Sequence, residues 1–290
     1  MAMLKMPEIV PFAPVATPVL KWAGGKTSLL PELVRRMPAG WRRGEYYEPF
    51  IGGGALFFAL APTRATIGDI NPRLTSMYGA LQTDVEHVIR NLRGLEERHD
   101  VEQYARVRDA LNLDSDSTPI TFAAKRAAHL IYLNRTCFNG LYRENKSGAF
   151  NVPMGNYAKP AICRPKILRA AAKVLMPAAI VTGCYDEITC TATRGDFVYF
   201  DPPYDVLPTS DNFASYTKHA FGRTEQKELA QLFHDLVKRG VRCMLSNSDT
   251  RFVRGLYKGH RIHRVECARS INSDAGGRGA VHEVIVMGGY

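Results

Sequence analysis

The segment "DFVYFDPPY", residues 196–204, ends an apolar run with a carboxylate, two prolines and an aromatic ring. Asp201 and the carbonyl of Pro202 can accept two hydrogen bonds from an exocyclic amino group, and Pro202 and Pro203 fix the direction of that carbonyl. Tyr204 can stack on the planar ring that carries the amine. Holding both amino hydrogens frees the nitrogen lone pair for attack, which fits in-line transfer of a methyl group from a sulfonium donor. On its own, the segment is also explained by a surface turn after a strand.

A glycine turn followed by an acid indicates a cofactor pocket. In "YYEPFIGGGALFFAL", Gly52 and Gly54 lie between an expected strand and an expected helix, where the missing Cβ lets the backbone approach a ligand closely. Asp69 lies 15 residues after Gly54, at the end of the next expected strand, where a carboxylate can accept hydrogen bonds from ribose hydroxyls. A tight turn explains the glycines equally well, but the pairing with Asp69 favours an adenosine-containing cofactor.

The segment "LKWAGGKTSLLPEL" is similar to a P-loop but lacks one of its glycines, because Leu20 stands where the first would be needed. This mismatch excludes a P-loop ATPase. Lys26 and Trp22 could instead offer a cation and an aromatic face to a small anionic ligand, whereas a solvated surface lysine is the simpler explanation of Lys26.

The charge of the chain favours a polyanionic partner such as nucleic acid. The net charge is +10 and the pI is about 9.4. Between Pro119 and Met176, ten Lys and Arg side chains face one acid, Glu144, which gives this stretch a net charge of +9. Aromatic residues suited to stacking on bases are interleaved with these charges: Phe122, Tyr132, Phe138, Tyr142, Phe150 and Tyr157.

Two different environments are expected inside this basic stretch. Phe122 and Tyr132 lie at helical spacing, which predicts core positions. The segment "NRTCFNGLYRENKSG" is too polar and irregular for core, and a loop of this kind could enter a DNA groove. A solvated helix face is the alternative explanation of the charges.

The remaining composition predicts a soluble, cytoplasmic protein without a metal site. The six cysteines form no CxxC pair and no histidine spacing of the kind that zinc sites use, so reduced thiols are expected. The Pro-rich first 20 residues contain no apolar run long enough for a signal peptide or a membrane span.

The order of the expected elements predicts an α/β fold with an insertion. Strand, glycine turn, helix, strand and acid follow one another up to about residue 72, as in the first half of a doubly wound nucleotide-binding unit. Helical segments then occupy residues 73–162, and strands alternate with helices again from residue 163. We therefore expect a catalytic domain of residues 1–72 and 163–290, interrupted by a mostly helical insertion.

The chain resembles the Dam-type DNA adenine-N6 methyltransferases, the D12 class (alpha group), from about Leu20 onward. The motifs that carry the resemblance occur in the family's order: "LKWAGGK", "EPFIGGGALF", "GDIN", "NRTCFNGLYR", "GAFNVPMGNY", "FDPPY", "LSNSDT" and "RSINS". The resemblance implies a Rossmann-like methyltransferase sheet that uses S-adenosylmethionine without a metal, and makes the insertion a target-recognition domain. It also implies that an adenine is flipped out of double-stranded DNA, within GATC.

The resemblance assigns roles to individual positions. Asp201, Pro202, Pro203 and Tyr204 match the catalytic tetrapeptide, with Tyr204 as the stacking aromatic. The implied cofactor residues are Trp22, Lys26, Phe50, Gly52, Gly54, Asp69 and Asp201. The implied DNA contacts are Lys21, Arg135, Phe138, Asn139, Leu141, Arg143 and Asn156.

Within the DNA-contact set, Phe138 and Asn139 match residues that insert at the flipped base. Leu141 and Arg143 match base readers of members that recognise GATC, and Lys21 matches a lysine that contacts a guanine. The sequence departs from its relatives at two positions. Phe138 stands where several have Tyr, and Asn156 stands where some have Arg.

Two rival functions remain open. The same chemistry could act on RNA or on a protein amide, although amide-acting relatives tend to carry Asn at the position of Asp201. A non-catalytic DNA-binding relative is the second rival, and its hallmark would be damage to "DPPY" or the glycine turn, both of which are intact. We expect a monomer in a bacterial or phage-infected cell, at the nucleoid, and the sequence leaves open whether a cognate restriction endonuclease accompanies it.

Overall fold

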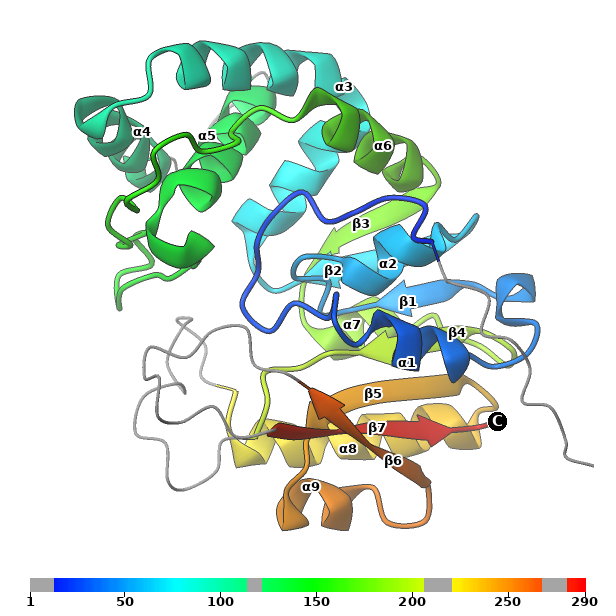
Figure 1. The fold of residues 1–290 in the computed structure, drawn as a ribbon. Coiled ribbons are helices and arrows are strands. Elements are labelled where there is room, and N and C mark those ends of the chain that lie inside the picture. The colour runs from blue at the N-terminus through cyan, green and yellow to red at the C-terminus, as the bar shows by residue number, and fades with distance from the viewer. Residues whose placement is uncertain (1–12, 114–121, 206–220, 268–280) are drawn as a thin grey trace, which may run out of the picture.

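The computed structural model describes residues 13–113, 122–205, 221–267 and 281–290, and it confirms the predicted Rossmann-like α/β fold. In the described parts of the chain, seven strands form one sheet in the order β3-β2-β1-β4-β5-β7-β6 (Figure 1). The first five strands in this order are parallel, and β7 pairs antiparallel with both β5 and β6. The strands are β1 (Tyr46–Glu48), β2 (Ala65–Asp69), β3 (Ala178–Thr182), β4 (Phe197–Phe200), β5 (Arg242–Ser248), β6 (Arg261–Cys267) and β7 (Val281–Gly288).

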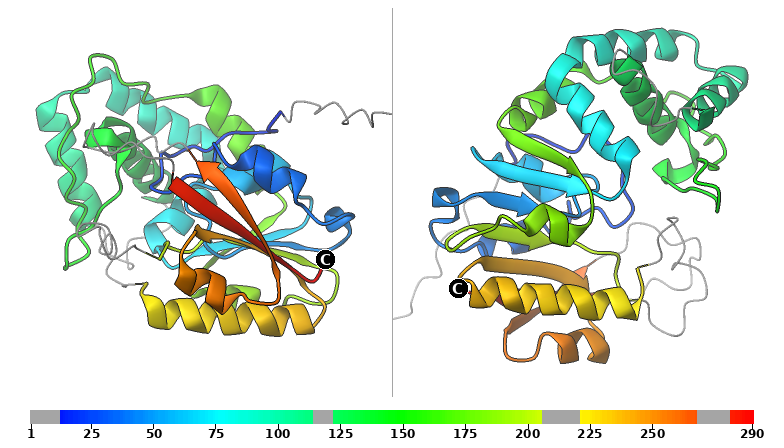
Figure 2. Two further views of the ribbon diagram at one scale, coloured as in Figure 1. Left: turned by 60° about the horizontal axis from the view of Figure 1, so that its bottom comes forward. Right: turned by 180° about the vertical axis from the view of Figure 1, so that it is seen from behind.

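Helices cover both faces of the sheet (Figure 2). They are α1 (Leu30–Arg35), η1 (Trp41–Arg43), α2 (Ala55–Leu60), α3 (Pro72–Glu97), α4 (Val101–Leu113), α5 (Ala123–Thr136), η3 (Phe138–Gly140), α6 (Pro165–Leu175), α7 (Tyr185–Thr189), α8 (Arg223–Lys238) and α9 (Arg251–Leu256).

The side chains of alternate strand residues pack into two separate apolar layers. Tyr46 and Phe197 pack with α1, α2 and α3 on one face, whereas Tyr47 and Val198 pack with α8 and α9 on the other. This follows from the two-residue period of a strand, which sends neighbouring side chains to opposite faces. Burial on both faces explains why these central parallel strands are almost entirely apolar.

The order of the strands reverses between β1 and β4. The chain builds the sheet outward from β1 in one direction, then returns to β4 and builds in the other. In such sheets ligands bind beyond the carboxyl ends of the strands, at the point where the order reverses. The glycine turn follows β1 and "DPPY" follows β4, so the two predicted chemical motifs flank this point.

Helix α3 connects the sheet to the helical part of the chain. Its residue Asp84 has non-helical angles (φ −151°, ψ 62°), and the Asp84 side chain accepts a hydrogen bond of 3.1 Å from the His87 N–H, as an N-cap does. Before this break, Gln82 donates to the Leu175 and Ala178 carbonyls beside β3. Helix α3 also packs extensively on α5. The boundaries predicted for the insertion, residues 73 and 162, remain predictions, and α3 belongs to both parts.

The helical part stands beside the sheet as a lobe of α4, α5 and the second half of α3 (Figures 1 and 2). Tyr132 of α5 is fully buried, as predicted. The core position predicted for Phe122 is wrong, because its side chain is 49% exposed. Phe122 immediately precedes α5, where the helical spacing that suggested burial no longer applies.

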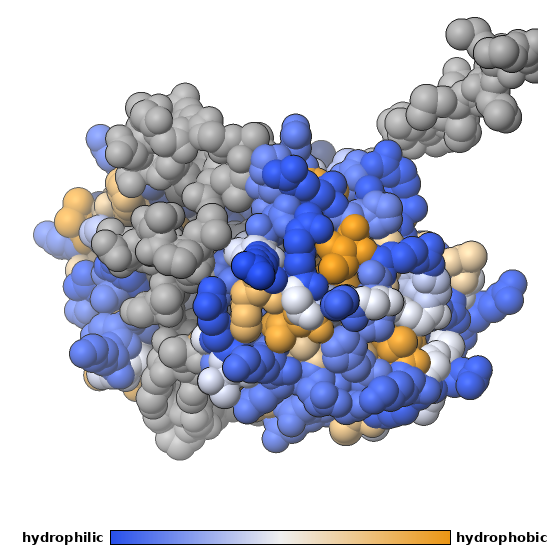
Figure 3. Space-filling view, turned by 90° about the horizontal axis from the view of Figure 1, so that it is seen from below, coloured by the Kyte–Doolittle hydropathy of each residue, from blue (hydrophilic) through white to orange (hydrophobic). Residues whose placement is uncertain are grey.

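Among the described residues, no helix combines the length and hydrophobicity needed to cross a membrane. From below, the described surface is mainly hydrophilic, with small separate hydrophobic patches (Figure 3).

Candidate active site

The carboxylate of Asp201 lies directly after β4 and is held through one of its two oxygens. Lys26 Nζ lies 2.8 Å from Asp201 Oδ1, and Ser246 Oγ donates to the same oxygen at 2.8 Å. Oδ2 accepts no hydrogen bond from any residue that the structure describes. Burial raises the pKa of Asp201, and the Lys26 ammonium opposes this rise. The described residues thus leave one carboxylate oxygen of Asp201 available for an incoming donor.

The carbonyls of the two prolines differ in their hydrogen bonding. Gln226 Nε2 donates to the Pro203 carbonyl at 2.7 Å. The Pro202 carbonyl has no hydrogen-bond donor within the described parts of the chain. Counting only the described residues, the segment therefore offers two acceptors without partners, Asp201 Oδ2 and the Pro202 carbonyl.

The ring of Tyr204 completes this group. Lys26 Nζ lies 4.6 Å from the ring centroid, and the Tyr204 hydroxyl donates to Glu283 Oε2 of β7 at 2.8 Å. The ring is thus held at both its face and its hydroxyl. Lys26, a buried residue, also donates to the Gly24 carbonyl, so its ammonium joins the loop before α1 to the loop after β4.

The glycine turn needs glycine for two reasons. Gly52 and Gly54 have positive φ angles of 45° and 68°, which favour glycine. A Cβ at Gly52 would also lie 2.8 Å from Trp22 Cδ1, so the Trp22 ring rests on the turn. Trp22 and the turn therefore form one surface, and its role in binding a cofactor remains a prediction.

Asp69 ends β2 next to this turn, as predicted. Its Oδ2 accepts from the Gly52 N–H at 3.2 Å and its Oδ1 from the Asn71 N–H at 3.0 Å. Asn71 in turn caps α3 through a 3.0 Å hydrogen bond from the Arg73 N–H, with Pro72 in the first turn. Burial raises the pKa of Asp69 to about 6. The carboxylate is oriented by backbone donors, and the residue as a whole is half-buried.

The predicted cofactor residue Phe50 lies in an aromatic cluster. Its ring stacks on Tyr185 at 5.4 Å and meets Phe221 edge-on at 5.7 Å. This cluster adjoins the apolar layer beneath α8.

The helical lobe is joined to the site through the segment around Lys21. Asn134 of α5, a buried residue, accepts from the Lys21 N–H at 2.8 Å and donates to the Lys21 carbonyl at 2.7 Å. Trp22 stacks on Tyr142 with centroids 5.2 Å apart. Lys21 Nζ lies 5.2 Å from the Tyr157 ring centroid. The predicted base-contacting lysine and the predicted cofactor tryptophan are therefore neighbours at one junction.

The loop after α5 exposes several of the predicted DNA contacts. Phe138 is 52% exposed, and Asn139 is exposed with a left-handed φ of 56°. Leu141 is half-buried, and Asn156 is exposed. Arg143 is exposed and donates from Nε to Asn151 Oδ1 at 2.9 Å, which orients its guanidinium along the loop.

Two expectations for this stretch need correction. Tyr142 and Phe150 are buried, so they are core residues and not stacking surfaces for bases. An isolated antiparallel bridge between Glu144 and Phe150 gives part of the loop the form of a hairpin.

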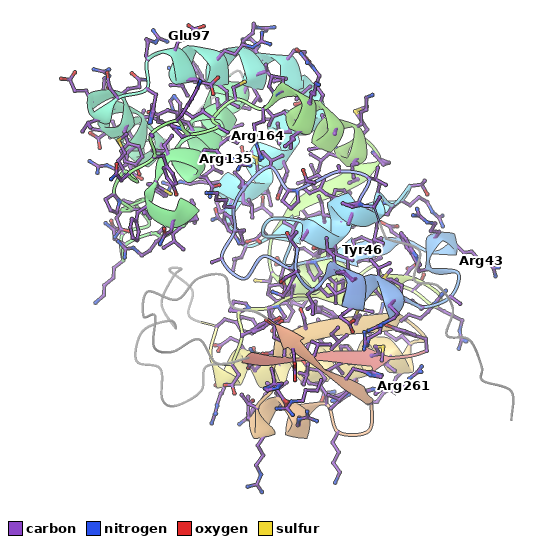
Figure 4. The ribbon with its side chains drawn as sticks, viewed as in Figure 1. Arg43, Tyr46, Glu97, Arg135, Arg164 and Arg261 are labelled. Carbon is purple, nitrogen blue, oxygen red and sulfur yellow. The ribbon has the colours of Figure 1, made fainter. Side chains whose placement is uncertain are left out.

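Arg135 is directed toward protein in this structure. Its guanidinium donates to the Val19 carbonyl, and Arg164 approaches the same oxygen at 3.5 Å. Figure 4 shows Arg135 and Arg164 side by side next to the N-terminal segment. The prediction that Arg135 contacts DNA remains untested, and the observed contact gives it a structural role.

Three residues beside the site received no role from the sequence: Glu48, Ser246 and Glu283. Glu48 ends β1, is 2% exposed, and accepts from the Tyr46 hydroxyl at 2.5 Å. Burial raises the pKa of Glu48 to about 8, so it is mainly neutral at pH 7. The acid in "YYEPF" was a visible signal for Glu48, whereas Ser246 and Glu283 become neighbours of the site only through strand pairing.

A separate hollow of about 490 Å³ lies between α8 and α9. Its lining consists of Arg223, Arg251, Phe252, Gly255 and Leu256, none of which is a predicted site residue. The candidate site is therefore the group around Asp201.

A family model described as D12 class N6 adenine-specific DNA methyltransferase matches residues 22–271. The protein belongs to this family. The match includes the glycine turn after β1 and "DPPY" after β4, and it identifies the described fold as that of a DNA adenine methyltransferase.

Several named relatives are similar in sequence to this D12 methyltransferase over most of its length. The type II methyltransferase M.MjaIII of Methanocaldococcus jannaschii is 38% identical, covering 93% of this chain and 98% of the relative. The type II methyltransferase M1.LlaDCHI of Lactococcus lactis subsp. cremoris is also 38% identical, covering 93% and 94%. A DNA adenine methylase of Vibrio cholerae is 35% identical, covering 92% and 94%.

Proposed function

We propose that the protein methylates N6 of an adenine flipped out of duplex DNA, within GATC, with S-adenosylmethionine as the donor. One observation carries the proposal. Among the described residues, Asp201 Oδ2 and the Pro202 carbonyl are two acceptors without donors in the same short motif as Tyr204. An adenine amino group has two hydrogens on a flat ring, so it matches this arrangement in number and in shape.

The protein's residues activate the amine mainly by placement. Hydrogen bonds from the amine to Asp201 and Pro202 draw its hydrogens toward the two acceptors, and Tyr204 holds the ring between them. The nitrogen lone pair is then less delocalised and points away from the acceptors. Ionised Asp201 can also accept the proton that nitrogen must lose after methylation.

The cofactor region fits an adenosine with a charged tail. Gly52 and Gly54 let the backbone approach closely, and Asp69 offers a carboxylate to ribose hydroxyls. Bound S-adenosylmethionine would supply an electrophilic methyl group on a sulfonium. We assign its contacts to Trp22, Lys26, Phe50, Gly52, Gly54, Asp69 and Asp201.

We assign DNA recognition to the insertion and to the junction with it. The exposed Phe138 and Asn139 would occupy the space of the flipped base, at an unstacking cost of a few kcal/mol. Lys21, Leu141, Arg143 and Asn156 would contact bases or the backbone. A guanine read by Arg143 supports GATC, because arginine can bind guanine through two hydrogen bonds.

The test is to incubate the protein and S-adenosylmethionine with plasmid DNA free of methylation, and to map modified bases by single-molecule sequencing. Methyladenine confined to GATC is the expected result. Methyladenine at another motif would retain the chemistry and overturn the specificity. The absence of methyladenine despite intact cofactor binding would overturn the proposal and favour an RNA or protein acceptor.

A further inference from the structure

Two uncharged polar side chains are buried behind the candidate site. Gln226 of α8 is 1% exposed and Asn247 of β5 is 0% exposed. Burying an amide is unfavourable unless hydrogen bonds compensate for the lost water. The hydrogen-bond partners of Gln226 and Asn247 therefore indicate what these buried amides do.

The hydrogen bonds form a directional chain. Gln226 Nε2 donates to the Pro203 carbonyl at 2.7 Å, and Gln226 Oε1 accepts from Asn247 Nδ2 at 3.0 Å. Asn247 Oδ1 accepts from the Asp205 N–H at 3.1 Å. The two ends fix the orientation of both amides, because a carbonyl can only accept and a backbone N–H can only donate.

This chain holds the main chain on both sides of Tyr204. The Pro203 carbonyl belongs to the peptide before Tyr204, and the Asp205 N–H belongs to the peptide after it. The rigid φ of Pro202 and Pro203 transmits this constraint to the Pro202 carbonyl, which precedes it by one residue. The Asp205 carboxylate is fixed further by the Thr250 hydroxyl at 2.9 Å.

We propose that Gln226 and Asn247 are positioning residues that aim the Pro202 carbonyl and the Tyr204 ring at the acceptor base. The inference rests on the proposed function, since it takes the held groups to bind an adenine amine. Neither side chain contacts the base. Both act through the peptide groups that they hold.

Gln226→Glu tests the proposal with almost no change in shape. An ionised carboxylate cannot donate to the Pro203 carbonyl, whereas a neutral carboxylic acid can donate to it and still accept from Asn247. The ratio of kcat in the variant to kcat in the wild type should therefore fall as pH rises through the pKa of the new carboxyl group. Burial places that pKa above the usual range of glutamate. We expect a total fall of about 100-fold, the effect of misplacing reacting groups by about 1 Å.

Gln231→Glu is the matched control, because Gln231 is an exposed residue of the same helix. The ratio of kcat in Gln231→Glu to kcat in the wild type should stay constant over the same pH range. Affinities for S-adenosylmethionine and for duplex DNA should stay close to wild type in both variants, since neither residue touches a ligand.

The positioning role would be overturned if the kcat ratio for Gln226→Glu did not change with pH. It would also be overturned if weaker binding of S-adenosylmethionine or DNA fully explained the loss of activity. If this variant does not fold, Asn247→Asp tests the same chain, because an ionised carboxylate cannot donate to Gln226 Oε1. A wild-type protein without adenine methylation would instead overturn the proposed function, so the two failures are distinguishable.

Discussion

Removing the positive charge of Lys26 should move the acid side of the activity profile to higher pH. Lys26 Nζ lies 2.8 Å from Asp201 Oδ1, and the two side chains are only 8% and 18% exposed. Burial raises the pKa of Asp201, and Lys26 is the largest of the effects that lower it. In Lys26→Met burial acts without this opposition, so the pKa of Asp201 rises and the carboxylate is protonated at a higher pH.

The size of the effect follows from the contact. An opposite charge at this range lowers the pKa of an aspartate by about 1–3 pH units, which corresponds to about 1.4–4 kcal/mol. The acid limb of kcat should therefore move upward by about 1–3 pH units. Activity at low pH is lost first, because protonated Asp201 no longer accepts from the amine as an anion.

The assay is methyl transfer to duplex DNA at saturating DNA and S-adenosylmethionine, measured between pH 5 and 9. Saturation is needed because Lys26 is also a predicted cofactor contact. Lys26→Arg keeps the charge and should keep the acid limb close to its wild-type position. An acid limb that stays in place in Lys26→Met would refute the reasoning.

Three further predictions concern separate parts of the molecule. The pKa of Glu48 is raised by burial from 4.5 to about 8, so its neutral form contributes stability that is fully present below pH 4.5 and lost as pH rises through about 8. Glu48→Gln should flatten the dependence of the free energy of unfolding on pH across this window, by about 1.4 kcal/mol per pH unit, and an unchanged slope would contradict the assignment. Asp69→Asn should weaken S-adenosylmethionine binding by about 10–100-fold in a calorimetric titration while DNA binding is retained; equal losses for both ligands would argue against a cofactor role. Arg143→Ala should lower the discrimination between cognate and near-cognate DNA by about 1–3 kcal/mol without changing cofactor affinity. Lys146→Ala, at the tip of the same hairpin, is the control and should leave this discrimination unchanged. Equal losses of activity at cognate and near-cognate sites in Arg143→Ala would exclude base reading.

The parts of the fold carried by local patterns were predictable from the sequence. The apolar strands, the glycine turn after Glu48 and the acid at Asp69 each depend on neighbouring residues, and all lie where the sequence placed them. Asp201 and Tyr204 belong to one short motif, so their proximity needed no knowledge of the tertiary structure.

Features that depend on distant pairing were not predictable in the same way. Strand β6 is difficult to predict from the sequence because "RIHRVEC" carries many polar residues, as an edge strand can. Glu283 reaches Tyr204 only because β7 inserts antiparallel beside β5. The burial of Tyr142 and Phe150 likewise depends on packing that a polar, irregular sequence does not reveal.

The most direct test of the central claim is a structure of the protein with a GATC duplex and a non-reactive analogue of S-adenosylmethionine. The account predicts a flipped adenine stacked on Tyr204, with N6 within about 2.7–3.2 Å of both Asp201 Oδ2 and the Pro202 carbonyl. An adenine that stays in the duplex, or an N6 bound elsewhere than at these two oxygens, would contradict it.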